Sequence, residues 1–306
     1  MKQKRIIPIT LLSSLLLITT LFTGCINTET TDKIGVLVTI VPQIKMVENI
    51  GGSYTDVTVM VPAGQSPHSF EPTPFQMMQV AQASVYFTVG SGVEFEEVYL
   101  TTIQEQNSNL MLYDCSENIT VISFDEHYNA EHNQTNEGED EHNHEGTDPH
   151  IWTSPENFKK MATVVYNGLT DIDPAHQEEY YSNYQTYIAK INELHTNIST
   201  LLTPYKGQYF MVYHPAWGYF GDTYQLQMIA IEDEGKQPGP AGISAIINQA
   251  RAKNITVIFV APEFDTSSAE TIAIEIDGTV SYADPLMSNY IKTLETLAQN
   301  IVSGFQ

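Results

Sequence analysis

The chain has 306 residues, of which 13 are Lys or Arg and 37 are Asp or Glu, and its formal net charge at pH 7 is -24. Such a negative field repels nucleic acid and concentrates cations, so we expect no nucleic-acid partner. The length is enough for two domains of ordinary size. With only two cysteines, stability must come from the hydrophobic core and not from a disulfide framework.

Residues 1–24 have the pattern of a secretory signal. Lys2, Lys4 and Arg5 provide a positive start, and an apolar stretch follows from Ile6 to Phe22. The stretch ends in Thr23-Gly24-Cys25, and a small residue before Cys predicts cleavage there and lipidation of Cys25. An ordinary transmembrane anchor is the alternative. Both interpretations place the body of the protein outside the cytoplasm, on the outer face of the cell membrane.

Apolar runs of strand length recur along the first half of the chain. They predict strands at Ile34 to Val41, Asp56 to Val61, Ser84 to Val89 and Ile119 to Phe124, with a helix at Pro74 to Ala83. Several are continuous runs of Val, Ile and Phe, which favours strands buried on both faces of a sheet. We therefore expect an N-terminal α/β lobe over residues 33–172.

A low-complexity segment from Glu126 to Asp148 interrupts this pattern. It lacks apolar periodicity and is expected to be disordered in the absence of metal. Acidic residues alternate there with four histidines. Ordering a disordered segment costs entropy, so these side chains are expected to be weak, exchangeable metal ligands: His127, His132, His142 and His144.

A long helix is predicted at residues 173–203. Asp173 offers an N-cap and Pro174 suits the first helical position. Apolar residues then follow at alternating spacings of four and three from Tyr180 until Pro204 stops the pattern. A helix of about 28 residues would be roughly 42 Å long. We interpret it as a rigid connector lying against two lobes; a coiled-coil partner helix is the alternative.

The remaining residues, 204–306, repeat the α/β pattern. Strands are predicted at Tyr209 to Tyr213, Gln227 to Ile231, Ile255 to Val260 and Val280 to Ala283, and helices at Gly242 to Ala252, Ser267 to Glu275 and Met287 to Val302. The sequence thus predicts two similar α/β lobes joined by one long helix.

Four side chains with metal-binding capacity follow apolar runs or stand in turns, two in each half: His68, His150, His214 and Asp284. Ligands of open α/β sheets bind at the carboxyl ends of strands, so we expect these four to meet in one cleft between the lobes. Three imidazoles and one carboxylate form a complete tetrahedral set for Zn²⁺. His176 and His195 are expected to be solvated or packing residues.

Several motifs resemble the metal-specific substrate-binding proteins of ABC transporters, the zinc/manganese cluster. In the first half these are residues 40–43, 61–74, which include Pro67-His68, and 89–94. The stretches Asp148-Pro149-His150-Ile151-Trp152, residues 214–220, residues 234–238 and Asp284-Pro285-Leu286 with Tyr290 resemble later parts of the same family. The resemblance runs from about Ile34 to Val302.

The resemblance implies a metal held between two lobes and delivered to a membrane permease powered by a cytoplasmic ATPase. The histidine-rich acidic loop is similar to that of the zinc-specific members, and the imidazole at position 214 stands where manganese-handling members often have a carboxylate. The expected cargo is therefore Zn²⁺, with Mn²⁺ possible, and the expected state is a monomer. Asp284 stands at the position that varies most in the family, and water could replace it.

Two other classes of function stay open at this level. A storage or adhesion lipoprotein would use the same metal ligands without a transporter. An exported zinc hydrolase would need an open coordination position and a general base. A site with four protein ligands leaves no open position, and HExxH and GxSxG motifs are absent from the sequence, so we expect the chain not to be an enzyme.

Overall fold

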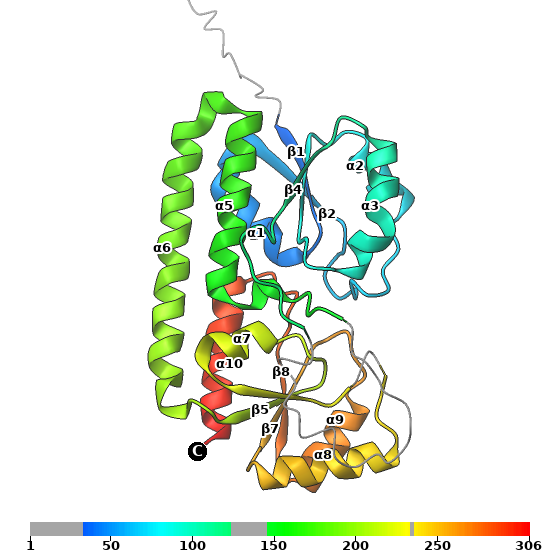
Figure 1. Ribbon diagram of the computed structural model, residues 1–306, viewed down its shortest axis with the longest axis vertical. Helices are drawn as coiled ribbons and strands as arrows, with labels where there is room; N and C mark the ends of the chain where they lie inside the picture. The colour runs from blue at the N-terminus through cyan, green and yellow to red at the C-terminus, as the bar shows by residue number, and fades with distance from the viewer. Residues whose placement is uncertain (1–32, 124–145, 233–235) are drawn as a thin grey trace, which may run out of the picture. The chain divides into compact units, whose positions relative to one another are not determined.

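The computed structural model describes residues 33–123, 146–232 and 236–306. These residues form two parallel four-stranded sheets, one before and one after the long helix α6 (Figure 1). The first sheet has the order β2-β1-β3-β4 and consists of β1 Ile34–Val38, β2 Thr55–Val59, β3 Val85–Thr88 and β4 Met111–Asp114. The second has the order β6-β5-β7-β8 and consists of β5 Tyr209–Val212, β6 Gln227–Ala230, β7 Val257–Val260 and β8 Thr279–Tyr282. The predicted pair of similar α/β lobes is confirmed.

Helices connect the strands of both lobes. The first lobe contains α1 Val41–Gly51, α2 Pro74–Val80, α3 Glu94–Gln106 and α5 Pro155–Ile172, and the second contains α7 Gly218–Tyr224, α8 Pro240–Ala252, α9 Ser267–Glu275 and α10 Tyr290–Gly304. Helix α6 spans Gln177–Leu202. Local sequence sets several of these boundaries. Thr73 caps α2 and Ser154 caps α5, and in both cases a proline follows in the first turn.

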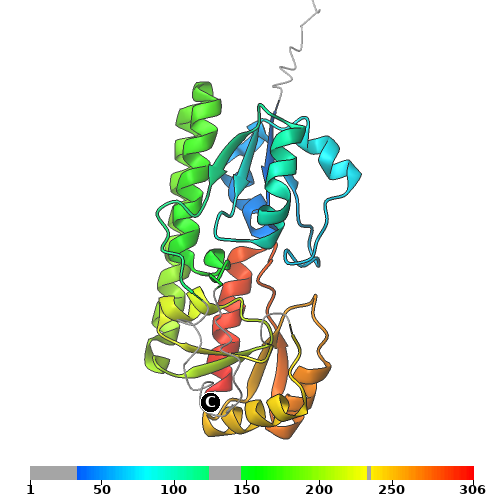
Figure 2. The same cartoon turned by 45° about the vertical axis from the view of Figure 1, so that its right-hand side comes forward.

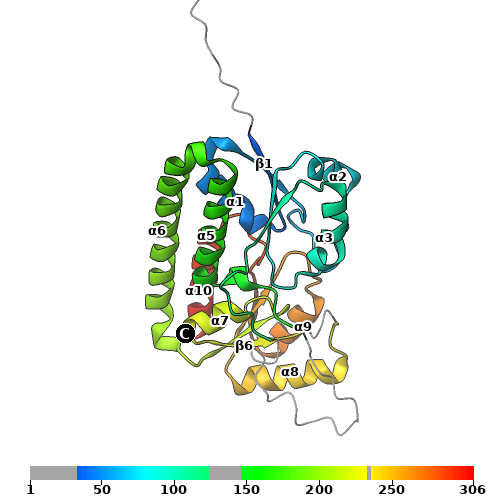
Figure 3. The same ribbon diagram turned by 45° about the horizontal axis from the view of Figure 1, so that its top comes forward.

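Strands β5, β6 and β7 of the second sheet are largely buried. Along β5, Phe210 and Val212 join the large core that also fills the first lobe, whereas Met211 joins a smaller core with α8 and α9. Figure 3 shows α8 and α9 together on one side of this lobe and α10 on the other. Burial on both faces explains why these strands appear in the sequence as continuous apolar runs.

Helix α6 is the predicted connector. Its seam residues Tyr180, Tyr187, Ile191, Leu194 and Ile198 are buried. The helix packs against α1 and α5 of the first lobe and against α7 and α10 of the second (Figures 1 and 2). The apolar seam is therefore used within the chain. The helix begins three residues later than the Pro174 signal, because Pro174–His176 forms a 3-10 turn.

Two of the strands predicted for the first lobe differ from the structure. The first strand stops at Val38, since Val41 and Pro42 already belong to α1. The fourth strand is Met111–Asp114, an edge strand whose side chains are exposed or half-buried. In the predicted strand at Ile119, the described residues contribute only an isolated bridge from Ser123 to Thr147.

Three residues of the segment predicted to be disordered, 146–148, belong to the described residues, and Asp148 among them is fully buried. The four loop histidines, residues 1–24 and Cys25 lie outside the described residues. Among the residues that are described, no helix is both long and apolar enough to cross a membrane.

Candidate metal centre

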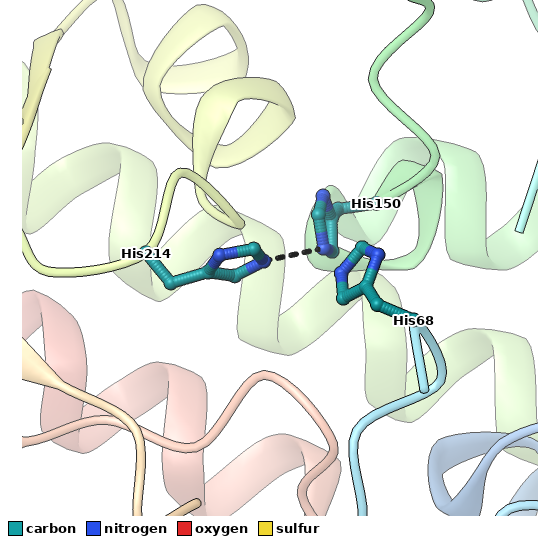
Figure 4. A group of neighbouring side chains, drawn as sticks. All are labelled: His68, His150 and His214. Carbon is teal, nitrogen blue, oxygen red and sulfur yellow. Dashed lines mark hydrogen bonds between the residues drawn. The ribbon is translucent and has the colours of Figure 1, made fainter. Parts of the chain in front are cut away.

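Three of the predicted ligands meet at one point. Each of His68, His150 and His214 offers a ring nitrogen, and these three atoms lie within 4.8 Å of one another. The Nε2 atoms of His150 and His214 are 3.3 Å apart, and all three rings turn toward a common centre (Figure 4). Within the described parts of the chain, this is the one group of three or more metal-capable side chains with such spacing.

The three histidines come from different parts of the fold. His68 lies in the loop between β2 and α2, and His214 follows the end of β5 by two residues. His150 immediately precedes the 3-10 turn Ile151–Thr153 that leads into α5. The side chain of His150 is almost fully buried, and that of His68 is 28% exposed.

Each histidine has a carboxylate beside its other ring nitrogen. The Nδ1 atom of His150 lies 2.7 Å from Asp148 Oδ1, that of His214 lies 2.5 Å from Glu232 Oε1, and that of His68 lies 2.8 Å from Glu94 Oε2. A carboxylate that accepts the Nδ1 proton fixes the tautomer in which Nε2 carries the free lone pair. For His150 and His214, the bonds from Nδ1 to Asp148 and Glu232 therefore leave the two Nε2 atoms facing the same place, and a ring nitrogen of His68 lies within 4.8 Å of them.

Burial keeps His214 neutral. Its pKa is lowered to about 4, mainly by burial and further by the neighbouring His150 and His68, although the hydrogen bond to Glu232 acts in the opposite direction. A neutral imidazole is the form that binds a metal. At neutral pH this side chain is ready to act as a ligand without first losing a proton.

Sequence reasoning did not identify the outer carboxylates Glu94 and Glu232. Glu94 opens α3, and Glu232 follows the end of β6 by two residues, at the same edge of the second sheet as His214. Burial raises the pKa of Glu94, but the hydrogen bond and charge of His68 outweigh it, so the net pKa is lowered. Position at the carboxyl end of a neighbouring strand is the signal that could have revealed Glu232.

Asp284 is not part of the three-histidine group. It follows β8, and its Oδ1 accepts a hydrogen bond of 2.7 Å from the backbone N–H of Leu286. The residues after it, Pro285 and Leu286, line the pocket that contains the histidines, and so does an acidic residue that the sequence analysis passed over, Glu263. Burial raises the pKa of both carboxyl groups, and Asp284 further raises that of Glu263.

The two histidines predicted to pack or face solvent lie elsewhere. His176 stacks on Tyr54 with ring centroids 3.8 Å apart, at the start of α6. His195, within α6, stacks on Tyr224 at 5.6 Å. Neither belongs to the metal-capable group.

Residues 36–304 match the family described as ZnuA, the periplasmic component A of the zinc-uptake complex. The manganese-binding lipoprotein MntA of Halalkalibacterium halodurans is 26% identical over 275 residues, which cover 85% of this chain and 84% of that protein. The zinc-binding protein AdcA of Streptococcus pyogenes is 25% identical over 267 residues; these cover 83% of this chain but only 50% of AdcA.

Solved structures agree with this assignment. A crystal structure of ZnuA superimposes with a TM-score of 0.80 and 32% sequence identity, covering 90% of this chain and 100% of that chain. The match includes both lobes and the connecting helix. The chain therefore belongs to the ZnuA family of periplasmic zinc-uptake components, which are substrate-binding proteins of metal-uptake ABC transporters.

Proposed function

We propose that this chain captures Zn²⁺ with His68, His150 and His214 and delivers it to an ABC permease that is powered by a cytoplasmic ATPase. The observation that carries the proposal is the convergence of three ring nitrogens, one from each histidine, on rings whose Nδ1 atoms lie beside carboxylates. Membership of the zinc-uptake family supports the transport step.

The spacing of the nitrogens supports a tetrahedral ion. With Zn–N bonds of about 2.05 Å, two nitrogens at a tetrahedral angle stand about 3.3 Å apart. The His150 and His214 Nε2 atoms are separated by 3.3 Å. Two lone pairs that face each other at that distance repel unless a cation or a proton lies between them. A bound divalent ion therefore removes the repulsion between these two nitrogens.

Manganese is the second candidate cargo. Mn²⁺ prefers oxygen ligands and a higher coordination number, and carboxylate oxygens are close by, from Glu94 beside His68 and from Glu263 in the wall of the pocket. The relative MntA is named for manganese. We place zinc first because the atoms that converge are nitrogens and because Zn²⁺ lies above Mn²⁺ in the affinity order.

Further parts of the proposal concern residues outside the described ones. Signal cleavage after residue 24 and a lipid on Cys25 would hold a monomeric protein on the outer face of the cell membrane. The four loop histidines, His127, His132, His142 and His144, would collect ions loosely near the cleft. Among the described residues, the proposed units are lobes at residues 33–172 and 204–306 with the connector at residues 173–203, and Asp284 is the fourth ligand that the sequence predicts.

A competitive zinc titration against a chromophoric chelator tests the central proposal. The mature chain is expected to bind one tight equivalent and several weak ones. His214→Ala should remove the tight equivalent and leave the weak ones, whereas the matched control His195→Ala should leave both unchanged. Equal losses from the two variants, or a tight equivalent that disappears only when the loop histidines are replaced, would contradict the assignment and favour a storage role.

A further inference from the structure

Glu263 stands in the wall of the same pocket as His68, His150 and His214. It lies in the loop between β7 and α9 and is only partly exposed. A carboxylate in such surroundings loses part of its hydration and gains a favourable partner when a cation enters the pocket. Asp284, the acidic residue expected from the sequence, is not among the residues that line this pocket.

The strand order explains why Glu263 lines the pocket and Asp284 does not. In the order β6-β5-β7-β8, the central strands β5 and β7 are direct neighbours, and Tyr213, next to His214, donates its backbone N–H to Phe259 O of β7 at 2.7 Å. The order of connections reverses between these two strands, and ligands of open α/β sheets bind at that point. Glu263 follows β7, whereas Asp284 follows the edge strand β8, two strand spacings or about 9.6 Å from β5.

Phe264 holds this loop against the site. Its ring stacks on that of His214, with centroids 4.9 Å apart and an angle of 23° between the planes. Its backbone N–H donates to Ala261 O at 3.2 Å, which closes a tight turn around Glu263. The residue that follows Glu263 is thus packed on His214, which keeps the loop that carries Glu263 next to the site.

The charges around the two acidic residues also differ. Burial has the largest effect on the pKa of Glu263 and raises it, the charge of Asp284 also raises it, and that of His68 lowers it. Asp284 has one carboxylate oxygen engaged by the N–H of Leu286, in a local turn of its own backbone. Local bonding of this kind is a structural role for an Asp that precedes proline.

We propose that Glu263 supplies the fourth ligand when Zn²⁺ occupies the three-histidine site, and that Asp284 serves to shape the loop after β8. This proposal rests on the metal-capture function proposed above. It assigns the carboxylate of the set to the strand that adjoins β5 and replaces the ligand predicted from the sequence.

Zinc affinity of two neutral, nearly isosteric variants of the mature chain tests this assignment. Glu263→Gln is expected to weaken Zn²⁺ binding at least 100-fold, more than the 10- to 100-fold typical of losing an outer hydrogen-bond partner. Asp284→Asn is expected to change the affinity less than about 5-fold. Circular dichroism and thermal unfolding without metal show whether each variant is folded.

The visible absorption spectrum of bound Co²⁺ adds a second test, because it depends on the ligands of the metal and would not change if Glu263 had only a structural role. Co²⁺ bound to the parent chain and to Asp284→Asn should give the same visible d–d absorption spectrum, because the ligand set is the same. Glu263→Gln should change the band positions or intensity, since one carboxylate oxygen is lost from the metal.

The results for the three variants distinguish an error in the fourth ligand from an error in the metal site itself. A large loss with Asp284→Asn and a small one with Glu263→Gln would overturn the assignment in favour of the sequence-predicted ligand. Small losses with both, together with a large loss for His214→Ala, would overturn it in favour of water as fourth ligand and leave the function intact. If His214→Ala also kept tight binding, the metal site itself would be misplaced.

Discussion

The two lobes have the same strand order but equip the metal centre in different ways. The second lobe presents His214 directly after a central strand, and the exposed fractions of this side chain and its partner Glu232 are 10% and 3%. The first lobe presents His68 from a long loop after the edge strand β2, and the side chains of His68 and its partner Glu94 are 28% and 46% exposed. A shared topology fixes the edge of the sheet where a ligand stands, whereas the length of the loop decides how firmly it is held.

The segment around His150 is held firmly, by hydrogen bonds to residues of the second lobe. Trp152 donates its indole N–H to Pro285 O at 2.7 Å, and Tyr290 donates its hydroxyl to Trp152 O at 2.9 Å. Tyr219 of α7 donates to Asp148 O at 3.0 Å. The sequence predicted two ligands from each half, but these bonds attach His150 to the second lobe. His68 is then the ligand most able to move.

Removing Trp152 tests this attachment with the largest expected effect. Trp152→Ala should lower the free energy of unfolding by about 3–5 kcal/mol, because it empties a fully buried site and leaves the Pro285 carbonyl without its donor. The control Tyr282→Ala, at a side chain that is 67% exposed, should stay within about 0.5 kcal/mol. Urea unfolding of the metal-free protein measures both. A loss below 1 kcal/mol for Trp152→Ala would mean that the two lobes do not share this anchor.

The pH dependence of stability tests how deeply His214 is buried. Its pKa is lowered in the folded protein to about 4, from 6.5 in a model peptide. Between these values the unfolded chain binds a proton that the folded one does not, so stability falls as the pH falls from 6.5 to 4. The loss from this one group is roughly 3 kcal/mol at the low end of that window.

Urea unfolding of the metal-free parent chain and of His214→Gln across this window isolates the contribution of His214. The variant should lose less stability than the parent on acidification. Parallel curves for the two proteins would contradict the lowered pKa.

Replacing the carboxylates beside His214 and His68 tests whether the second lobe holds its histidine more firmly than the first lobe does. Glu232→Gln should weaken zinc binding about 10- to 100-fold, because a buried partner fixes the orientation and tautomer of His214. Glu94→Gln should weaken it less than 10-fold, since its half-exposed side chain acts through solvent-screened charge. Competition titrations at 0.05 and 0.5 M salt measure both variants. Equal losses that ignore salt would show that the two lobes hold their histidines equally firmly.

The smallest effect is expected where the first lobe touches the His150 segment. Ser91, which is buried, donates its hydroxyl to Pro149 O at 2.5 Å. Ser91→Ala leaves that carbonyl without a donor and should cost about 1–2 kcal/mol of stability. Thr186→Ala, which removes an exposed hydroxyl on α6, is the matched control with an expected change near zero. Thermal unfolding compares them, and no difference between the two would remove Ser91 as an anchor of this segment.

Much of the fold follows from local patterns. The helix stops and starts at proline and capping residues, such as Thr73-Pro74 and Ser154-Pro155, and doubly buried strands appear as continuous apolar runs. The edge strand Met111–Asp114 was not predicted: its apolar run, residues 110–113, is only four residues long and contains none of the β-branched residues that are typical of strands. The apolar stretch at Ile119 predicts a strand, but the N–H of Ile122 bonds instead to the hydroxyl of Tyr219 in the second lobe.

The sequence by itself determined the α/β class, the connecting helix and the three histidines that converge, because apolar periodicity and residue type are local properties. Tertiary structure alone decided which side chains surround them. The pairing of His214 with Glu232, the attachment of Trp152 to Pro285 and the entry of Glu263 into the pocket join residues that are distant in sequence or lie on different strands. Which strand adjoins which, and how a loop is buried, depends on the packing of the whole chain, and no single segment encodes it.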